Sequence, residues 1–170
     1  CYQLAVGITI KRVNDMHVER MKAGGYAVSL SLIPADGRAL TRLTRGANML
    51  KQYGSVLGRI EQAYGVPGEV LVAIWGLETD FGVNIGKFPT LRSLATLAYD
   101  CRRTDLFKAE LMDALRIVER GDIAPQDLRG AWAGEIGQTQ FMPSSYIKFA
   151  VDFDSNGRRD LLRSPRDVLA

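Results

Sequence analysis

The stretch Gly65–Gly82, GVPGEVLVAIWGLETDFG, joins a helix-start signal to one of the most apolar runs in the chain. The Gly-Val-Pro turn suits the beginning of a helix, because proline is well tolerated in the first helical turn. The residues that follow are hydrophobic on all sides, which predicts a buried helix. With Pro67 as the first helical residue, Glu78 lies about three turns along, close to Gly82, where we expect the helix to end.

Glu78 is therefore a carboxylate at the end of an apolar helix. Burial among Trp75, Leu77 and Phe81 and the negative end of the helix dipole both disfavour its ionised form, which predicts a raised pKa. A carboxyl group that stays protonated near neutral pH is what a general acid for a glycosidic oxygen requires. The alternative is that Glu78 projects into solvent or pairs with an arginine.

Apolar residues at steps of three and four predict helices over most of the chain from residue 38 onward. Residues 38–64 are expected to form one long amphipathic helix or two, with Gly54 as a candidate break. Residues 90–103 and 105–122 show the same periodicity, and Gly121 is expected to end the second of these helices. Only residues 25–33, GYAVSLSLI, alternate like a strand. The predicted fold class is mainly α, with a minor β element near the N-terminus.

Composition bounds the class of protein. The chain has 170 residues, of which 46% are hydrophobic and 24% charged, enough apolar material for one globular core. Its net charge of +3 is spread along the chain, so we expect no nucleic-acid partner. No run reaches the roughly 18 apolar residues of a membrane span, and the first residues lack the layout of a signal peptide. We expect no transmembrane segment, and an exported protein would have lost its leader.

Two cysteines and one histidine limit the disulfide and metal chemistry. Cys1 and Cys101 do not make a disulfide framework, and the usual zinc-ligand clusters are absent. Cys1 is either a lipid-bearing mature terminus or an accident of where the chain was cut. The oligomeric state stays open.

The segment Gly130–Tyr146, GAWAGEIGQTQFMPSSY, is rich in residues that suit sugar binding. Amides bind hydroxyl and N-acetyl groups, and aromatic faces cover sugar rings. The candidate residues are two glutamines, Gln138 and Gln140, and three aromatics, Trp132, Phe141 and Tyr146. The alternative is a glycine-rich helix-packing segment that ends at Met142 and Pro143.

The segment Asp152–Asp160, DFDSNGRRD, matches the first half of a calcium-binding EF-hand loop. Asp152, Asp154 and Asn156 occupy alternate positions, and Gly157 is sixth. The twelfth position is Arg163, where a bidentate glutamate is expected, so a complete standard loop is excluded. Asp167 could fold back as a substitute ligand. A turn built by Asp and Asn side chains without an ion is the alternative.

Four stretches, in order and spacing, resemble the membrane-bound lytic murein transglycosylase B family. They are YGVPGEVLVAIWGLETDFG, LATLAYDCRR, GAWAGEIGQTQFMPSSY and AVDFDSNGRRDLL. The resemblance runs from about Leu40 to Ala170. Residues 38–170 are therefore expected to form a lysozyme-like transglycosylase domain that is truncated at its C-terminal end, whereas residues 1–37 have no clear assignment.

The resemblance implies a lysozyme-like α-helical fold that cleaves the β-1,4 bond between N-acetylmuramic acid and N-acetylglucosamine and leaves 1,6-anhydromuramyl ends. No cofactor is required for this chemistry, and a structural Ca²⁺ is a candidate. Peptidoglycan glycan strands are the implied partner, in the periplasm or cell envelope of a Gram-negative bacterium. The implied catalytic acid/base is Glu78, the implied cleft residues are Arg102, Arg103, Gln140 and Phe141, and the implied calcium ligands are Asp152, Asp154, Asn156, the Arg158 carbonyl and Asp167.

One carboxylate suffices for this reaction, because the substrate's N-acetyl group can act as nucleophile and the sugar's 6-hydroxyl can replace water. Two departures from the family pattern leave alternatives open. Glu135 stands where a small apolar residue is common and could be the second carboxylate of a muramidase-type hydrolase. Ala131 replaces a common serine. The chain could also bind peptidoglycan without turning it over.

Overall fold

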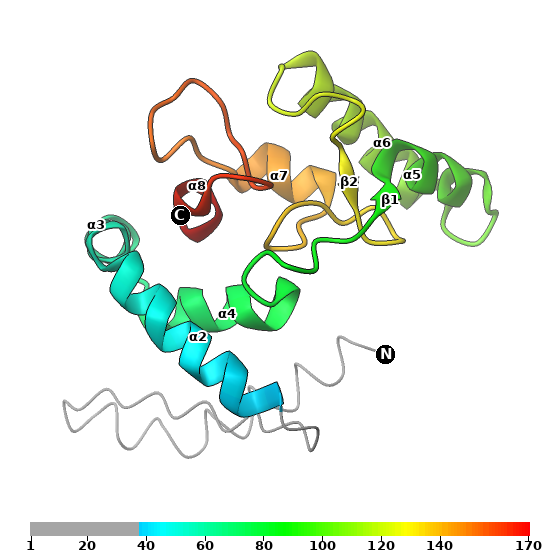
Figure 1. Ribbon diagram of the computed structural model, residues 1–170. Helices are drawn as coiled ribbons and strands as arrows, with labels where there is room; N and C mark the ends of the chain where they lie inside the picture. The colour runs from blue at the N-terminus through cyan, green and yellow to red at the C-terminus, as the bar shows by residue number, and fades with distance from the viewer. Residues whose placement is uncertain (1–37) are drawn as a thin grey trace. The chain divides into compact units, whose positions relative to one another are not determined.

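The computed structural model describes residues 38–170 (Figure 1). Over this range the fold is mainly α, as predicted, and the predicted strand at residues 25–33 lies outside it. None of the described helices is both long and apolar enough to cross a membrane. The elements are α2 (Arg38–Gln52), α3 (Gly54–Tyr64), α4 (Gly68–Thr79), β1 (Phe88–Pro89), α5 (Thr90–Tyr99), α6 (Thr104–Glu119), β2 (Arg129–Gly130), α7 (Pro143–Phe149) and α8 (Pro165–Leu169).

The helix ends follow the predicted signals with small differences. The amphipathic stretch 38–64 forms two helices, which separate at Tyr53, and Gly121 follows the end of α6 with a left-handed φ of 74°. Helix α4 begins at Gly68, so Pro67 is its N-cap residue and not its first helical residue. The same helix ends at Thr79, because Asp80 already adopts the left-handed conformation; the prediction that Gly82 ends it was wrong.

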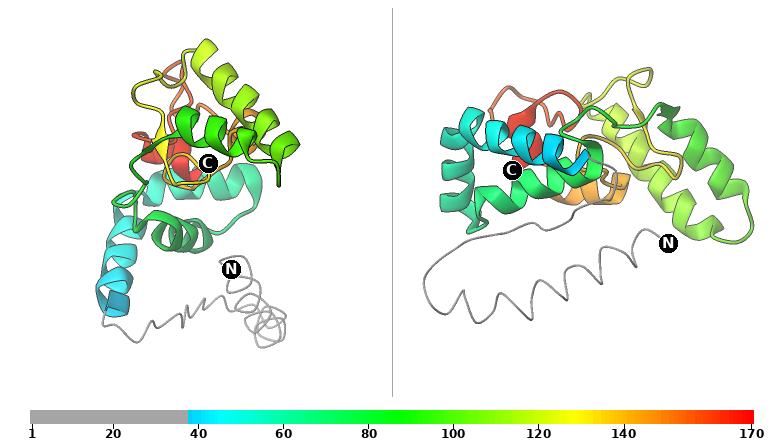
Figure 2. Two further views of the ribbon diagram at one scale, coloured as in Figure 1. Left: turned by 90° about the vertical axis from the view of Figure 1, so that its right-hand side faces the viewer. Right: turned by 60° about the horizontal axis from the view of Figure 1, so that its bottom comes forward.

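The helices pack in two groups. Helix α4 contacts α2, α3 and α8, whereas α6 contacts α5 and α7. Figure 1 shows α5 and α6 as a hairpin apart from α2 to α4, and the views in Figure 2 agree. Each group buries apolar side chains. In the first they include Leu57, Ile60, Val72, Trp75 and Leu169, and in the second Leu94, Ala114, Ile117, Leu128, Ile136 and Tyr146.

The glycine-rich segment is a network of short bridges, and one of its glycines, Gly134, also packs against Leu94 of α5. Strand β1 pairs antiparallel with β2, and Ile136 bridges to both Gly130 and Phe141. A Cβ at Gly130 would lie 1.7 Å from the Glu135 carbonyl oxygen, so a larger residue does not fit there. These close approaches place the 130–141 segment against the chain that follows α4, because a Cβ at Gly86 would lie 2.1 Å from the Gly130 oxygen.

A buried carboxylate joins α6 to the start of α7. Glu110 is only 6% exposed, and its two oxygens accept hydrogen bonds from the backbone N–H and the hydroxyl of Ser144, at 2.9 and 2.7 Å. Ser144 lies in the first turn of α7, where the backbone N–H groups have no partner within the helix. Glu110 therefore caps α7 from a neighbouring helix.

We expect Glu110→Ala to lower the free energy of unfolding by about 1–3 kcal/mol, because it leaves two donors of the partly buried Ser144 without their acceptor. Denaturant unfolding followed by circular dichroism measures the change. Glu119→Ala, at the exposed end of the same helix, is the control and should change stability by less than about 0.5 kcal/mol. Equal losses for the two variants would contradict the capping role of Glu110.

Candidate active site

Glu78 lies in the last turn of α4, one residue before the helix ends. Its side chain is exposed and Leu77 is 45% exposed, so the prediction that Glu78 is buried among apolar neighbours was wrong. The direction of the predicted shift is nevertheless right, because partial desolvation by the surrounding protein raises the pKa of Glu78. The helix thus presents to solvent a carboxyl group that holds its proton more tightly than a free glutamate.

The turn after Glu78 is built from three consecutive residues with left-handed φ values. Asp80, Phe81 and Gly82 have φ angles of 53°, 59° and 81°. This turn folds the Phe81 ring back onto α4, where a Cβ at Gly76 would lie 2.7 Å from the ring. The ring also meets the edge of Trp75, with centroids 5.7 Å apart. The spacing of glycine, phenylalanine and glycine around Glu78 therefore reflects a chain that folds back on its own helix.

Arginines of α2 hold this turn from one side. Arg45 contacts Asp80 twice, through Nη1 to a carboxylate oxygen at 2.8 Å and through Nη2 to the main-chain oxygen at 3.0 Å. The Arg45 guanidinium also lies 5.2 Å from the centre of the Phe81 ring. Arg42 lies 3.5 Å from the second carboxylate oxygen of Asp80. These contacts fasten α2 to the residues that follow Glu78.

Gln138 holds the end of α4 from the other side. Its side-chain oxygen accepts a hydrogen bond from the Trp75 indole N–H at 2.8 Å, and its side-chain nitrogen donates to the Leu162 oxygen at 2.8 Å. Its main-chain oxygen accepts from the Thr79 hydroxyl at 2.7 Å. Gln138 is 7% exposed, and both ends of its side-chain amide make internal hydrogen bonds. Its side chain therefore does not line a binding surface. Sequence patterns gave no signal for the role of Thr79.

The other predicted sugar-binding residues differ in exposure. Gln140 is partly exposed, has a left-handed φ of 53°, and donates to the Ile85 oxygen at 3.2 Å. Phe141 is partly buried against the core, and Trp132 is 66% exposed. Tyr146 is fully buried, its hydroxyl donates to the Arg159 oxygen, and burial raises its pKa. Tyr146 is therefore a core residue and does not present its ring to a ligand.

Arg102 and Arg103 lie in the turn between α5 and α6. Both are exposed, and Arg102 makes a bidentate ion pair with Asp100, with a shortest distance of 2.6 Å. The hydrogen bonds from Arg102 lower the pKa of Asp100 to about 2. The two arginines belong to the second helix group, whereas Glu78 belongs to the first.

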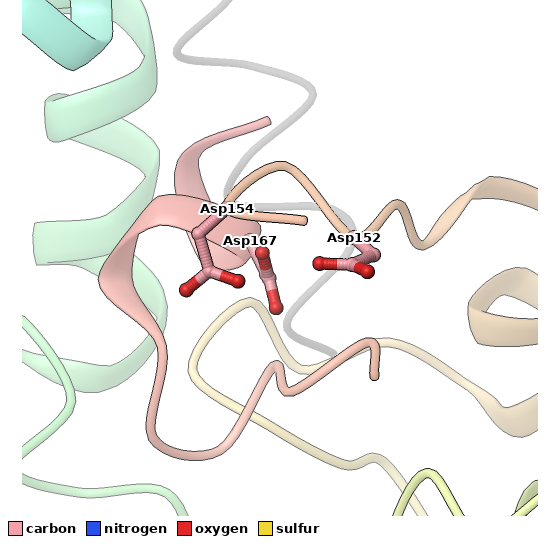
Figure 3. A group of neighbouring side chains, drawn as sticks. All are labelled: Asp152, Asp154 and Asp167. Atoms are coloured by element: carbon pink, nitrogen blue, oxygen red, sulfur yellow. The ribbon is translucent and has the colours of Figure 1, made fainter. Parts of the chain in front are cut away.

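The aspartate-rich segment forms a loop in which three predicted metal ligands meet. Oxygens of Asp152, Asp154 and Asp167 lie within 4.8 Å of one another, and Figure 3 shows the three carboxylates in one cluster. Asp152 accepts from the backbone N–H groups of Asn156 and Gly157, at 2.9 and 2.8 Å. Asp167 comes from α8, so the fold does return it to the loop as predicted.

The cluster suits an oxygen-binding cation such as calcium. One Asp154 oxygen is buried without a hydrogen-bond partner, and Asp167 is 2% exposed. Burial raises the pKa of Asp167, and the neighbouring charge of Asp154 raises it further, against hydrogen bonds from Asp160 and Phe153 that lower it. A divalent cation would offset this repulsion. Asn156 and Arg158 are exposed on the same loop, where the Asn156 side chain accepts from the Arg158 N–H at 3.0 Å.

The described part of the chain is similar in sequence and in structure to known proteins. Residues 38–170 match the family model of the transglycosylase SLT domain. Membrane-bound lytic murein transglycosylase B of Escherichia coli (strain K12) is 42% identical over 117 residues, which are 68% of this chain and 32% of that protein. SltB3 from Pseudomonas aeruginosa, solved in complex with NAG-anhNAM-pentapeptide, has a TM-score of 0.75 and 32% identity over 94% of this chain and 50% of its own.

A third relative bears on the aspartate-rich loop. The lytic transglycosylase Slt35 of Escherichia coli, solved in complex with calcium, has a TM-score of 0.73 and 38% identity, and the match covers 81% of this chain and 42% of its own. The chain thus spans about a third of the length of the curated relative and half or less of the two solved chains. The family expected from the four sequence motifs is confirmed, and the chain belongs to the transglycosylase SLT domain family.

Proposed function

We propose that this chain is a lytic transglycosylase domain that acts on peptidoglycan, with Glu78 as its single acid/base. It cleaves the β-1,4 bond between N-acetylmuramic acid and N-acetylglucosamine and leaves 1,6-anhydromuramyl ends. The observation that carries the proposal is the solvent-facing carboxyl group of Glu78, with a raised pKa, at a helix end held from two sides. The complex of its relative SltB3 with NAG-anhNAM-pentapeptide supports the class of substrate.

The proposed mechanism uses Glu78 twice. The protonated carboxyl group first donates its proton to the glycosidic oxygen as the bond to the muramyl carbon breaks. The substrate's N-acetyl oxygen stabilises that carbon. The Glu78 carboxylate then takes the proton of the 6-hydroxyl of the same sugar, whose oxygen closes the anhydro ring. A raised pKa suits the first step, and exposure lets the group reach its substrate.

The proposed binding surface combines partly exposed residues of the bridged segment with exposed residues of the α5–α6 turn. Gln140 and Phe141 lie on the bridged segment that contacts the chain after α4, and Arg102 and Arg103 supply positive charge from the α5–α6 turn. The stem peptides of peptidoglycan carry carboxylates, which arginines bind well. The proposed location is the periplasm or the cell envelope, where peptidoglycan lies.

Glu78→Gln should lower the cleavage of purified murein sacculi by at least about a hundredfold, because the amide keeps the shape of the side chain and cannot donate the proton. Released fragments are quantified by mass spectrometry. Glu69→Gln makes the same change at an exposed glutamate in the first turn of the same helix and should leave activity unchanged. A Glu78→Gln variant that retains more than a few per cent of activity would exclude Glu78 as the acid.

A muramidase-type hydrolase is the second candidate, because one oxygen of the half-buried Glu135 has no hydrogen-bond partner. Such an unpaired carboxylate could serve as the second catalytic group.

The mass of the product separates the two reactions. We expect muramyl products about 18 Da lighter than the hydrolytic ones, because the internal hydroxyl replaces water. Glu135→Gln should leave this product unchanged. A reducing muramic acid end as the main product, lost in Glu135→Gln, would establish the hydrolase instead. Binding to sacculi with no release of either product from the wild type would identify a binding domain without turnover.

We further infer that the aspartate-rich loop holds a structural calcium ion. Its ligands are the carboxylates of Asp152, Asp154 and Asp167, the side chain of Asn156 and the carbonyl of Arg158. The calcium complex of the relative Slt35 supports this inference, as does the unpaired oxygen of Asp154. The ion offsets two of the three negative charges of the neighbouring carboxylates and has no part in the chemistry.

Asp154→Asn tests the calcium site, because its effect on the melting temperature should differ between a buffer with chelator and a buffer with calcium. With a chelator the variant should melt at or above the wild-type temperature, because the substitution removes repulsion within the cluster and keeps an acceptor for Ser164. With calcium at about a hundred times its Kd, the wild type should gain about 2.7 kcal/mol, and the variant markedly less. Asp113→Asn, on the distant helix α6, is the control. Identical melting of the wild type in calcium and in chelator would contradict the site.

A further inference from the structure

We propose that the buried hydroxyl of Thr79 is a positioning group for the proposed reaction, which holds the last turn of α4, and with it Glu78, against the segment that carries Gln138 and Gln140. The inference rests on the proposed function and adds to it a residue that does not touch the substrate. Thr79 is 1% exposed and follows the exposed Glu78 directly. The two side chains therefore leave the same helical turn in different directions, one inward and one into solvent.

The Thr79 hydroxyl makes hydrogen bonds with two parts of the chain beyond α4, besides a longer one to the Trp75 oxygen at 3.5 Å within the helix. It donates to the main-chain oxygen of Gln138 at 2.7 Å and accepts from the backbone N–H of Gly82 at 3.0 Å. The first bond reaches 59 residues along the chain, and the second spans the left-handed turn. A hydroxyl group is both donor and acceptor, so one side chain fixes both contacts.

The left-handed turn after α4 is the segment that the Thr79 hydroxyl restrains. Left-handed φ angles cost roughly 1–3 kcal/mol at residues other than glycine, and such strain persists only where the surroundings enforce it. Asp80 and Phe81 both carry this cost immediately after the helix. Because helix ends fray readily, release of this turn would loosen the residues just before it, and Glu78 is among them.

A second hydrogen bond between α4 and Gln138 strengthens the restraint. Trp75 lies one helical turn before Thr79, and its indole N–H donates to the side-chain oxygen of Gln138. Gln138 thus contacts α4 at positions four residues apart, on its buried face. A Cβ at Gly82 would lie 2.3 Å from that same side-chain oxygen. Two points of contact fix both the height and the rotation of the last turn of the helix.

Catalytic groups must be held to within about 0.5 Å of their productive positions, and a displacement of 1 Å can cost about a hundredfold in rate. Loss of the Thr79 hydroxyl should therefore lower kcat with little effect on KM, since the residues proposed to bind glycan stay in place. The buried location of Thr79 excludes a direct contact with substrate. It is a positioning residue, and Glu78 remains the catalytic one.

Two pairs of variants isolate the hydroxyl. Thr79→Val keeps the shape and removes the hydroxyl, whereas Thr79→Ser keeps the hydroxyl and removes the methyl group. Thr79→Ala, compared with Thr79→Ser, supplies the same comparison should the valine variant fail to fold. On a soluble NAG-NAM oligosaccharide, below the melting temperature of every variant, we expect Val and Ala to lower kcat about tenfold to a hundredfold. KM should stay within about twofold, and Ser should recover most of the rate.

Amide hydrogen exchange at Gly82 provides a readout without activity. Its N–H is bonded to the Thr79 hydroxyl, so exchange should be faster in Thr79→Val than in the wild type and in Thr79→Ser. Equal exchange in all three would contradict the restraint itself. Faster exchange with unchanged kcat would contradict the positioning role alone. A wild type that cleaves no glycan would overturn the proposed function, while the exchange result would still decide whether the restraint exists.

Discussion

The strained turn at Asp80, Phe81 and Gly82 is the constraint on which the arrangement of the site depends. It ends α4 directly after Glu78 and sends the chain toward β1 and the bridged segment. Several contacts hold this turn together. Arg45 of α2 forms an ion pair with Asp80, and the Phe81 ring packs on Gly76. The main-chain oxygen of Gln138 accepts a hydrogen bond from Thr79, just before the turn. The proposed acid therefore lies where the two helix groups are joined.

Gln138 shows why residue type alone misplaces function. A glutamine in a glycine-rich segment suits sugar binding by its chemistry, and so does a nearby tyrosine. In the fold, Gln138 satisfies three internal partners and Tyr146 is buried in the core. Both side chains organise the segment from which Gln140 and Phe141 remain partly accessible. Residues of the same types can support a site or line it, and only their tertiary contacts tell the two roles apart.

The parts of the fold that local patterns control were predictable, and those that depend on distant contacts were not. Periodicity located α5 and α6, the apolar run after a Gly-Val-Pro turn located α4, and Gly54 marked the break between α2 and α3. All three are properties of neighbouring residues. The two-residue strands β1 and β2 carry no such pattern, since they form by pairing Phe88 with Gly130 and Pro89 with Arg129, which are far apart in the sequence. The sequence left Glu78 open between burial and projection into solvent for the same reason, because only the fold decides in which direction its apolar neighbours face. The return of Asp167 to the loop was foreseen from the missing twelfth ligand.

Exposure and a raised pKa of Glu78 are compatible because partial desolvation is enough to raise the pKa of a carboxyl group that still faces solvent. Before substrate binds, the protein removes only part of the water around the carboxyl group, which raises its pKa without burying it. A glycan strand laid across an exposed group would displace more of that water, and further desolvation favours the protonated form again. The bound polymer would thus add the further desolvation of Glu78 that the free protein lacks. A fully buried glutamate would hold its proton as well, but it could not deliver it to a polymer.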